Sequence, residues 1–450
     1  MKNIIAKSPT FSLIFSEQGL KETEYSLASY CITVDCEDGT LIYNNLSKEL
    51  LLLSKEEAEV LQDINSFNTP VAEYLKKHWF FVPVGTDTVK LCDQLLSTVK
   101  LFEKPRTANT YKSYTIMTTL DCNARCFYCF QKGRVQPTMS ADTARSIAEY
   151  IINHSDREKE ITINWFGGEP LYNKDAIDII CDRLNSEGVK FKSKIITNGY
   201  LLDKALLAEA KENWNTQKVQ ITLDGTEKIY NRTKNYIYKD TNPFETVIAN
   251  IGDLLNNEIK VIIRLNLGLH NADDLYKLVD FLSEKFGGRE NFSVYAHRLF
   301  DYDDSGKQVH KQDEIIKTIE IFNSFNDYLA EKGLFSYRKL DNTYTTNRCM
   351  ADSDNAIVIT PEGKLGKCEH FSDKEIIGDI YSEILDKDNI SEWKEKQTKL
   401  DICDNCAEYI NCMRLKKCPD ISPQCDIYQR DEKIQTLKKK ILNTYNNTKS

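Results

Sequence analysis

The stretch Asp121–Gln131, with the sequence DCNARCFYCFQ, places Cys122, Cys126 and Cys129 in a C-x3-C-x2-C pattern. Three thiolates this close together can converge on one soft metal centre. A structural zinc ion would need a fourth ligand nearby, and no further Cys or His follows before His154. Ferredoxin-type clusters also use four cysteines, at other spacings. The residues therefore predict an incomplete four-iron site whose open iron binds a substrate or cofactor, and the alternative is a loop of buried structural cysteines.

The residues between these cysteines, with Tyr128 just before the last one, resemble the signature of the radical S-adenosylmethionine (SAM) enzymes. The resemblance implies that Cys122, Cys126 and Cys129 hold a [4Fe-4S] cluster and that Tyr128 belongs to the SAM site. It also implies that the amino and carboxylate groups of SAM chelate the fourth iron. An electron entering the cluster then cleaves SAM to methionine and a 5′-deoxyadenosyl radical, which abstracts a hydrogen atom.

Chain length and composition narrow the class of protein. At 450 residues the chain is too long for one core and predicts two or three domains. A net charge of −9 argues against a nucleic-acid partner, and the absence of a long apolar run argues against a membrane protein. The first residues do not read as a secretory signal, so the fourteen cysteines predict metal sites in a cytoplasmic protein rather than disulfides. Four scattered cysteines are expected to have no role: Cys31, Cys36, Cys92 and Cys181.

Residues 1–105 are predicted to form a separate N-terminal domain. We expect two strands, at residues 30–35 and 40–43, and then three helices. The first helix begins at Ser54, the second covers residues 71–79, and the third begins near Asp87. This order resembles the winged-helix-like leader-binding domain of peptide-modifying enzymes, which binds an extended peptide along a sheet edge. The resemblance implies a precursor peptide as partner, and the alternative is a small cap that shields the barrel.

Residues 106–335 alternate strands and helices, which predicts an α/β domain with a parallel sheet and helices outside it. The expected strands lie near residues 113–119, 160–166, 192–197, 218–223, 260–266 and 292–297. Six units are fewer than a full barrel has, and the family resemblance implies a partial (β/α)6 TIM-like barrel. Functional side chains in parallel barrels gather at the carboxyl ends of the strands.

The segment Trp165–Pro170, with the sequence WFGGEP, closes the second of these strands. Its glycines let the backbone approach a ligand closely, and Glu169 supplies an acceptor for an ammonium group. The segment resembles the family's GGEP motif, so Gly167, Gly168 and Glu169 are expected to hold the amino group of SAM. The alternative is a simple turn that ends a strand.

Polar residues also end the third and fourth strands. Asn198, which begins an Asn-Gly pair, resembles the family's polar residue near SAM, although such a pair is also an ordinary turn. Thr222 stands where the family has a serine that donates its hydroxyl to SAM. Lys234 stands where the family has an arginine for the SAM carboxylate, but lysine lacks the two-pronged geometry of arginine. Arg232, two residues earlier, is a possible replacement.

On the fifth strand, Arg264 and Asn266 share one face, opposite apolar neighbours. This pair predicts a polar lumen suited to SAM or substrate, and the alternative is a structural pair within the barrel. His297 ends the sixth strand and is assigned no chemistry, because a lone histidine is more often structural.

Residues 336–430 hold a second group of cysteines that resembles the SPASM domain of radical SAM enzymes, which carries two auxiliary [4Fe-4S] clusters. The resemblance gives one cluster three ligands and leaves it one protein ligand short: Cys349, Cys368 and Cys418. It gives the other cluster four ligands: Cys403, Cys406, Cys412 and Cys425. Seven cysteines could also make two zinc sites. The spacing around Cys418 departs from the usual one.

Glu369 directly follows Cys368, in the slot where related enzymes that oxidise a side chain carry an acidic residue. That residue is expected to be catalytic and to take a proton from the substrate. The alternative is a solvent-facing neighbour of the cluster. The remaining residues, 431–450, are predicted to form a C-terminal docking helix.

Together these motifs predict a radical SAM oxidoreductase that matures a ribosomally synthesised (RiPP) precursor peptide. The predicted product is an oxidative crosslink, either a thioether or a C–C or C–O bond. The expected cofactors are three [4Fe-4S] clusters and SAM, and a flavodoxin or ferredoxin-type protein is the implied reductant. The alternatives are an anaerobic sulfatase-maturing enzyme that generates formylglycine, and a non-catalytic iron–sulfur scaffold or electron carrier.

Overall fold

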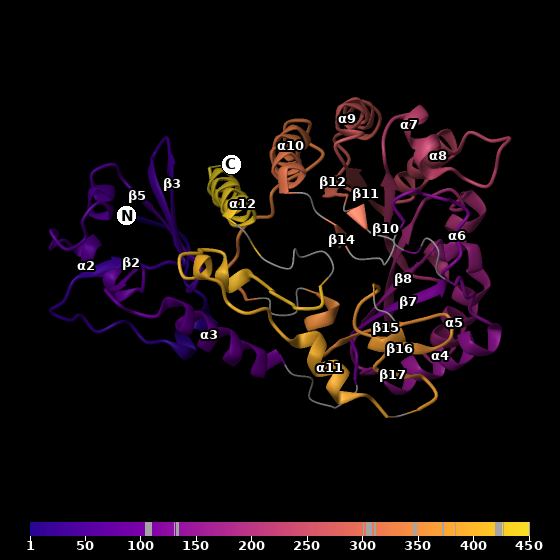
Figure 1. The fold of residues 1–450 in the computed structure, drawn as a ribbon, viewed down its shortest axis with the longest axis horizontal. Helices are drawn as coiled ribbons and strands as arrows, with labels where there is room; N and C mark the ends of the chain where they lie inside the picture. The colour runs from indigo at the N-terminus through magenta and orange to yellow at the C-terminus, as the bar shows by residue number, and fades with distance from the viewer. Residues whose placement is uncertain are drawn as a thin grey trace.

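A computed structural model of the chain shows the architecture, and the description covers all residues except 104–109, 130, 132–134, 300, 303–307, 310–311, 345–348, 371–372, 383, 419–424, 426 and 450. The N-terminal sheet and the barrel lie at opposite sides of the molecule (Figure 1). The chain from about residue 350 onward lies between them. This C-terminal part therefore contacts both of the other parts.

The barrel strands follow the predicted positions within about two residues. They are β7 (Ser113–Thr119), β8 (Ile161–Gly167), β9 (Phe191–Thr197), β10 (Thr216–Leu223), β11 (Lys260–Leu267) and β12 (Phe292–Arg298). Each pairs with the next in parallel, in the order β12-β11-β10-β9-β8-β7. Apolar residues of one parity, such as Ile163 and Trp165 on β8, are fully buried under the helices, so the other parity faces the lumen.

The helices of the barrel cover its outer face (Figure 1). They are α4 (Ala141–Asn153), α5 (Lys174–Ser186), α6 (Lys204–Glu212), α7 (Glu227–Lys234), α8 (Pro243–Asn256), α9 (Ala272–Phe286) and α10 (Gln312–Glu331), with the short η2 (Pro170–Asn173) after β8. Ser140 begins α4 by accepting a hydrogen bond from the amide of Thr143. The apolar stripe of each helix packs on the sheet, so the prediction of a partial α/β barrel is confirmed.

The C-terminal region extends the barrel sheet at its open edge. Strand β15 (Ala356–Ile359) pairs in parallel with β7, and β16 (Lys364–Gly366) and β17 (Gly378–Asp379) follow as antiparallel strands. The resulting nine-stranded sheet is mostly parallel. Because Cys368 lies just after β16, this pairing holds Cys368 beside the start of the barrel.

The N-terminal part contains a four-stranded antiparallel sheet in the order β1-β5-β4-β3. Its strands are β1 (Lys2–Ile5), β3 (Cys31–Cys36), β4 (Gly39–Asn44) and β5 (Glu49–Leu53), and a second small sheet pairs β2 (Tyr25–Leu27) with β6 (Phe81–Pro83). The helices are α1 (Pro9–Ile14), η1 (Glu57–Leu61), α2 (Pro70–Lys77) and α3 (Thr88–Glu103). The predicted capping box forms, because the Ser54 amide donates to Glu57 and the Glu57 amide donates to the Ser54 hydroxyl. Peptide binding by this part stays a prediction.

The last helix, α12 (Ile427–Asn446), packs against the N-terminal sheet and also contacts α10 of the barrel. Its apolar residues Leu437 and Ile441 are buried against Leu41, Tyr43 and other residues of the sheet. The loop around Ala407 also contacts the N-terminal part, because the side-chain amide of Asn45 donates a hydrogen bond to the Ala407 carbonyl at 2.8 Å. The predicted docking helix therefore docks on the first part of the chain.

The remaining described elements are short, except for α11. They are β13 (Asp301–Tyr302), β14 (Gln308–Val309), η3 (Met350–Asp352), η4 (Asp373–Glu375), α11 (Lys387–Lys394), η5 (Asp401–Cys403) and η6 (Tyr409–Asn411). None of the described helices is long and apolar enough to span a bilayer.

Candidate active site

A cavity of about 490 Å³ opens at the carboxyl ends of the barrel strands. Side chains from all six strands line it, together with the cysteine loop after β7 and the turn after β16. It gathers most of the residues that the sequence nominated: Cys122, Cys126, Tyr128, Cys129, Gly167, Gly168, Asn198, Thr222, Lys234, Arg264 and Glu369. The rule that parallel barrels function at this end of the sheet holds here.

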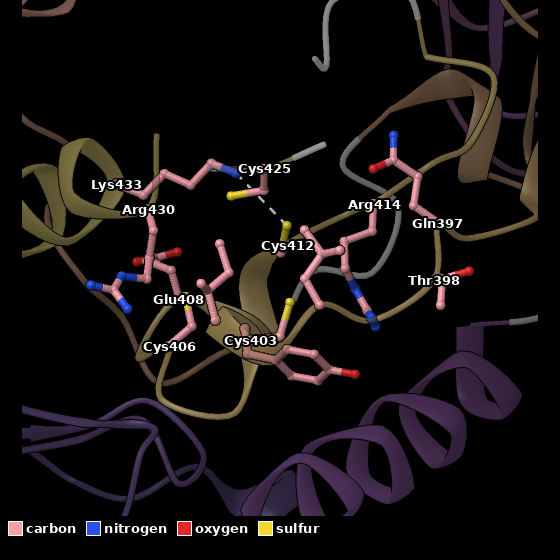
Figure 2. A pocket seen from close by; sticks show the side chains of 13 residues that line it. Gln397, Thr398, Cys403, Cys406, Glu408, Cys412, Arg414, Cys425, Arg430 and Lys433 are labelled. Atoms are coloured by element: carbon pink, nitrogen blue, oxygen red, sulfur yellow. Dashed lines mark hydrogen bonds between the residues drawn. The ribbon is translucent and has the colours of Figure 1, made fainter. Parts of the chain in front are cut away.

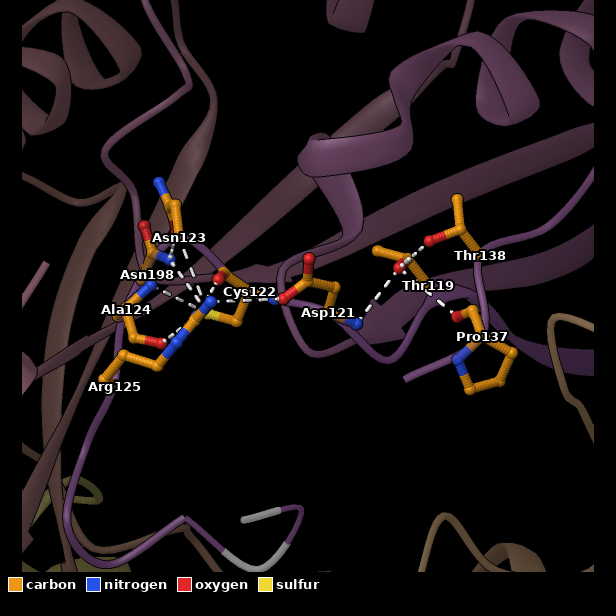
Figure 3. Close-up of polar contacts among 9 residues, drawn as sticks. All are labelled: Thr119, Asp121, Cys122, Asn123, Ala124, Arg125, Pro137, Thr138 and Asn198. Carbon is orange, nitrogen blue, oxygen red and sulfur yellow. Dashed lines mark hydrogen bonds and ion pairs between the residues drawn. The ribbon is translucent and has the colours of Figure 1, made fainter. Parts of the chain in front are cut away.

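The cysteine loop is fixed by a network of backbone and amide contacts (Figure 3). The sulfur of Cys122 accepts a hydrogen bond from the Ala124 amide at 3.3 Å, and the Asn198 side-chain amide approaches the same sulfur at 3.8 Å. The Asn198 amide also donates to the side-chain oxygen of Asn123 at 2.6 Å. Asn198, predicted from its strand-end position, therefore positions the loop as well as lining the cavity.

The two glycines at the end of β8 hold the same loop from the other side. The amide of Gly168 donates to the Thr119 carbonyl, and the amide of Glu169 donates to the Asp121 carbonyl, both at 2.9 Å. A Cβ atom on Gly168 would lie 2.2 Å from the Asp121 carbonyl oxygen. No residue larger than glycine fits there while the cysteine loop stays in place, so Gly168 is required for this close approach.

The carboxylate of Glu169 is not among the side chains that line the cavity, and its expected contact with the ammonium group of SAM stays a prediction. The side chain is fully buried, and its oxygens accept hydrogen bonds from the Thr197 hydroxyl at 2.7 Å and the backbone N–H of Asn198 at 2.8 Å. Burial raises the pKa of Glu169 to about 7, although these hydrogen bonds oppose the rise. Glu169 therefore braces the ends of two strands, and the glycines of the motif line the cavity.

Lys234 and Tyr128 meet at a buried carboxylate. The Asp224 carboxylate accepts from the Lys234 ammonium at 2.9 Å and from the Tyr128 hydroxyl at 2.7 Å. The Lys234 ammonium also donates to the Tyr128 hydroxyl at 3.0 Å. Asp224 thus neutralises the charge that was expected to meet the SAM carboxylate, and the lysine ties the cysteine loop to the end of β10. The proposed replacement, Arg232, is exposed and does not line the cavity.

The sequence analysis did not nominate Lys194 or Tyr295 for the cavity, and it assigned His297 no chemistry. Lys194 on β9 lines the lumen, and its ammonium donates to the Gln220 side chain at 3.0 Å. Burial lowers the pKa of Lys194 to about 8, and the charge of Arg264 acts in the same direction. Tyr295 and His297 on β12 also line the cavity, and the His297 ring lies 2.9 Å from the Arg298 carbonyl. The lumen-facing parity of the strands is the signal that would have found them.

The first auxiliary set lies beside this cavity. The pKa of Cys368 is raised chiefly by burial, and the charges of Glu369, Cys349 and Cys418 act in the same direction. Glu369 approaches the Cys368 sulfur at 4.0 Å and lines the cavity, as do Met350 and His370. The expected neighbour of the cluster therefore faces the same space as the first cysteine loop.

The second auxiliary set lines a separate small pocket against the N-terminal part (Figure 2). Its cysteines are the four that the resemblance grouped together: Cys403, Cys406, Cys412 and Cys425. The ammonium of Lys433 points at the Cys412 sulfur, 3.8 Å away. Although burial opposes it, the thiolate charge of Cys412 raises the pKa of Lys433. A cation placed among soft donors suits a site that carries net negative charge.

The donor chemistry of the first loop fits a [4Fe-4S] cluster. Cys122, Cys126 and Cys129 all line the cavity, and the charges of Cys126 and Cys129 both act on Cys122. Burial is the largest cause that raises the pKa of the Cys122 thiol, to about 12. A metal centre deprotonates the thiols that coordinate it, so a bound cluster would hold this cysteine as a thiolate. Within the described residues, no three Cys, His, Asp or Glu side chains converge tightly enough to hold a single metal ion.

Comparison with known families settles the class. Residues 116–282 match the family model of the Radical SAM superfamily. This region is a radical SAM domain. A [4Fe-4S] cluster and SAM are the cofactors of such a domain, and the chain is an enzyme of the radical SAM class. The alternative of a non-catalytic scaffold is set aside for that reason.

Two curated proteins show the range of similar sequences. A probable GTP 3′,8-cyclase of Archaeoglobus fulgidus is 24% identical over 272 residues, which cover 56% of this chain and 84% of that protein. The radical SAM cyclopropyl synthase TigE of Paramaledivibacter caminithermalis is 26% identical over 258 residues, which cover 50% of this chain. The chain spans about half of TigE, 54% of its length.

Two solved structures share the fold of the radical SAM domain and its flanking parts. Native anSMEcpe with bound AdoMet and Cp18Cys peptide matches with a TM-score of 0.58 at 17% identity, covering 74% of this chain and 99% of that one. Streptococcus suis SuiB bound to the precursor peptide SuiA matches with a TM-score of 0.51 at 14% identity, covering 86% and 94%. These likenesses establish the fold.

Proposed function

We propose that this protein is a peptide maturase that installs an oxidative crosslink in a ribosomally synthesised precursor peptide. The crosslink is a thioether or a C–C or C–O bond formed at an unactivated C–H position. The reaction removes two hydrogen atoms from the peptide: one leaves as a hydrogen atom, and the other leaves as a proton and an electron.

One observation carries this proposal: the cavity joins the two kinds of cysteine site. Cys122, Cys126 and Cys129 line it on one side, and Glu369 lines it where Cys368 follows β16. A net oxidation of the peptide needs a radical source and an acceptor for the surplus electron. Both are close to one substrate space in this arrangement, so a peptide segment in the cavity reaches both.

The residues of the chain have distinct roles in this proposal. A bound [4Fe-4S] cluster with SAM on its open iron supplies the 5′-deoxyadenosyl radical that abstracts hydrogen. Gly167 and Gly168 present backbone to SAM, and Asn198 and Thr222 offer polar side chains to it. Glu369 takes the proton that leaves the peptide, because it lines the cavity and is only partly buried.

Two further elements belong to the proposal. The auxiliary cysteines hold two more [4Fe-4S] clusters, of which the one at Cys349, Cys368 and Cys418 leaves a position for a substrate thiolate. The N-terminal sheet binds the leader of the precursor, and a flavodoxin or ferredoxin-type protein delivers the electron. The peptides bound to anSMEcpe and SuiB support a peptide as the substrate class.

The test is a search for small open reading frames beside the gene, anaerobic co-expression with each peptide found there, and mass spectrometry of that peptide. We expect a loss of two hydrogen atoms for each modification and none with a Cys126→Ala variant. A peptide of unchanged mass, in a sample with full iron content and active SAM cleavage, would refute the maturase assignment.

Formylglycine formation is a second candidate, favoured by the position of Glu369 in the cavity, where it can deprotonate a seryl or cysteinyl side chain. The two functions differ in their substrates. A synthetic sulfatase peptide that gains an aldehyde during turnover would favour the second candidate, and a modified neighbouring peptide would favour the first.

A further inference from the structure

The charges around the cavity do not balance. Two of its cations have partners outside the lumen, because Lys234 is paired with Asp224 at 2.9 Å and Arg298 with Glu432 at 3.4 Å. Lys194 and Arg264 form no ion pair with any residue that the structure describes. Lys194 donates to the side-chain oxygen of Gln220, and Arg264 donates to that of Asn266, each at 3.0 Å. Arg264 also shares a hydrogen bond with the hydroxyl of Tyr295.

Among the residues that the structure describes, a single carboxylate lines the cavity with these two cations. Glu369 lines the cavity, and its negative charge acts on the ammonium of Lys194 without coming within ion-pair distance. Arg264 acts on Lys194 as a like charge, so the two cations lie close enough to repel each other. Two partly buried cations with a single acidic neighbour leave the lumen one negative charge short, and such a site favours a bound anion.

The two cations lie below the strand ends where SAM is expected. Lys194 precedes Thr197, the last residue of β9, by three residues, and Arg264 likewise precedes Leu267 on β11. At the usual rise per residue, each Cα lies about 10 Å deeper than the end of its strand. The glycines and Asn198 of the SAM region stand at or beyond the strand ends. In the sheet register, Arg264 lies opposite Thr222, which is expected to meet SAM, whereas Lys194 lies level with Lys218, four residues earlier on β10. The two cations therefore line the lumen from the level of SAM down into the barrel.

We propose that Lys194 and Arg264 form a carboxylate-binding site that takes an aspartate or glutamate side chain of the peptide, close to the residue that is modified. This inference rests on the proposed function, because it names the substrate side chain that the maturase recognises. The guanidinium of Arg264 offers two parallel donors to a carboxylate, and Lys194 adds a point charge. Gln220 and Asn266 hold the two cations in position.

The carboxylate of SAM is the competing source of the same chemistry, and the experiment separates the two. The reconstituted enzyme, saturated with SAM, is titrated by calorimetry with two probes, N-acetyl-glutamate methylamide and N-acetyl-glutamine methylamide. We expect the glutamate probe to bind at least about tenfold more tightly than the glutamine probe, since only it supplies the missing charge. Lys194→Gln and Arg264→Gln each abolish that preference.

Lys218→Gln is the matched control. Lys218 lies beside Lys194 in the register of β9 and β10 and adds like charge to it, but it does not line the cavity. We expect this variant to keep the preference for the glutamate probe. Loss of the preference in Lys218→Gln to the same degree would overturn the site, because general electrostatics would then explain the binding.

Two other results would overturn the proposal. One is equal binding of the glutamate and glutamine probes to the unchanged enzyme. The other is competition between SAM and the glutamate probe, together with tenfold weaker SAM binding in Lys194→Gln, which would assign the cations to the SAM carboxylate. An unmodified precursor with an intact glutamate preference would refute only the maturase proposal, so the two failures are distinguishable.

Discussion

Replacing Gly168 with alanine is expected to break the first cluster site while leaving the rest of the fold intact. The added Cβ would lie 2.2 Å from the Asp121 carbonyl oxygen and 2.6 Å from that of Leu120, whereas ordinary contact begins at 3.4 Å. Both obstacles are backbone atoms of the segment that leads into Cys122, so a side-chain rotation cannot relieve them. The loop has to move by about 1 Å or more, at a cost of about 1–3 kcal/mol for overpacking.

A shift of that size matters because the loop positions the cluster and SAM together. A misplacement of about 1 Å in a reacting geometry costs on the order of a hundredfold in rate. We therefore expect Gly168→Ala to cleave SAM about a hundredfold more slowly under dithionite, measured as 5′-deoxyadenosine by chromatography. The iron of the auxiliary sites should be unchanged.

Gly252→Ala provides the control, because Gly252 lies within α8 and has room for a side chain. The nearest atom to its added Cβ would be a ring atom of Phe286, at 3.9 Å. That variant should keep full SAM cleavage and gain slightly in stability from the better helix former. If Gly168→Ala cleaved SAM at a rate within threefold of that of the unchanged enzyme, the cysteine loop would not depend on close packing against Gly168.

Three further predictions address separate features. Asp224→Asn leaves the Lys234 ammonium buried without its counter-charge, so it should lower the free energy of unfolding in urea by about 3–5 kcal/mol. The double variant Asp224→Asn/Lys234→Met should recover most of that loss. Equal stability of the single variant and the unchanged protein would contradict the buried pair. Cys412→Ala should lower the iron content after anaerobic reconstitution from about twelve to about eight atoms per chain, and an unchanged content would remove the second auxiliary site from the proposal. Because burial raises the pKa of Glu169 to about 7, the folded state holds this proton more tightly than the unfolded state. The stability that this proton contributes is fully present below the unfolded pKa and is lost as pH rises through 7. Between pH 4.5 and pH 8, the free energy of unfolding of the unchanged protein should therefore fall by about 3 kcal/mol relative to that of Glu169→Gln. Parallel stability curves for the two proteins would refute this.

Local patterns were enough to predict the barrel. Its strands are buried on the helix-facing side, so alternating apolar residues mark them clearly, as in β8. The strand β5 was missed because Glu49–Leu53 is a run of leucines without alternation, which does not distinguish a strand from a buried helix segment. Whether such a run forms a strand depends on the strands that pair with it. The partners of β5 are β1, which is distant in sequence, and β4, which lies across a turn.

The orientation of single polar residues was beyond local patterns. Glu169 looks like a ligand in sequence, and the donors that bury it in the structure, Thr197 and Asn198, come from the next strand. Lys192 and Lys194 share one parity on β9, yet Lys192 is exposed and pairs with Glu160, whereas Lys194 lines the lumen. Only the depth along the strand separates them, and depth depends on how the barrel closes. The grouping of the four cysteines around Cys412 was available through the family resemblance alone.

The contact of α12 with the N-terminal sheet has a consequence for biosynthesis. The Tyr445 hydroxyl bonds to Asp38 across 407 positions of sequence, and Ile441 and Leu437 cover the apolar face of β3 and β4. That face is translated well before α12, so it stays exposed to water until α12 has left the ribosome. A nascent chain therefore carries an uncovered apolar surface while the intervening residues are made, and slow translation of them exposes it to chaperones and proteases.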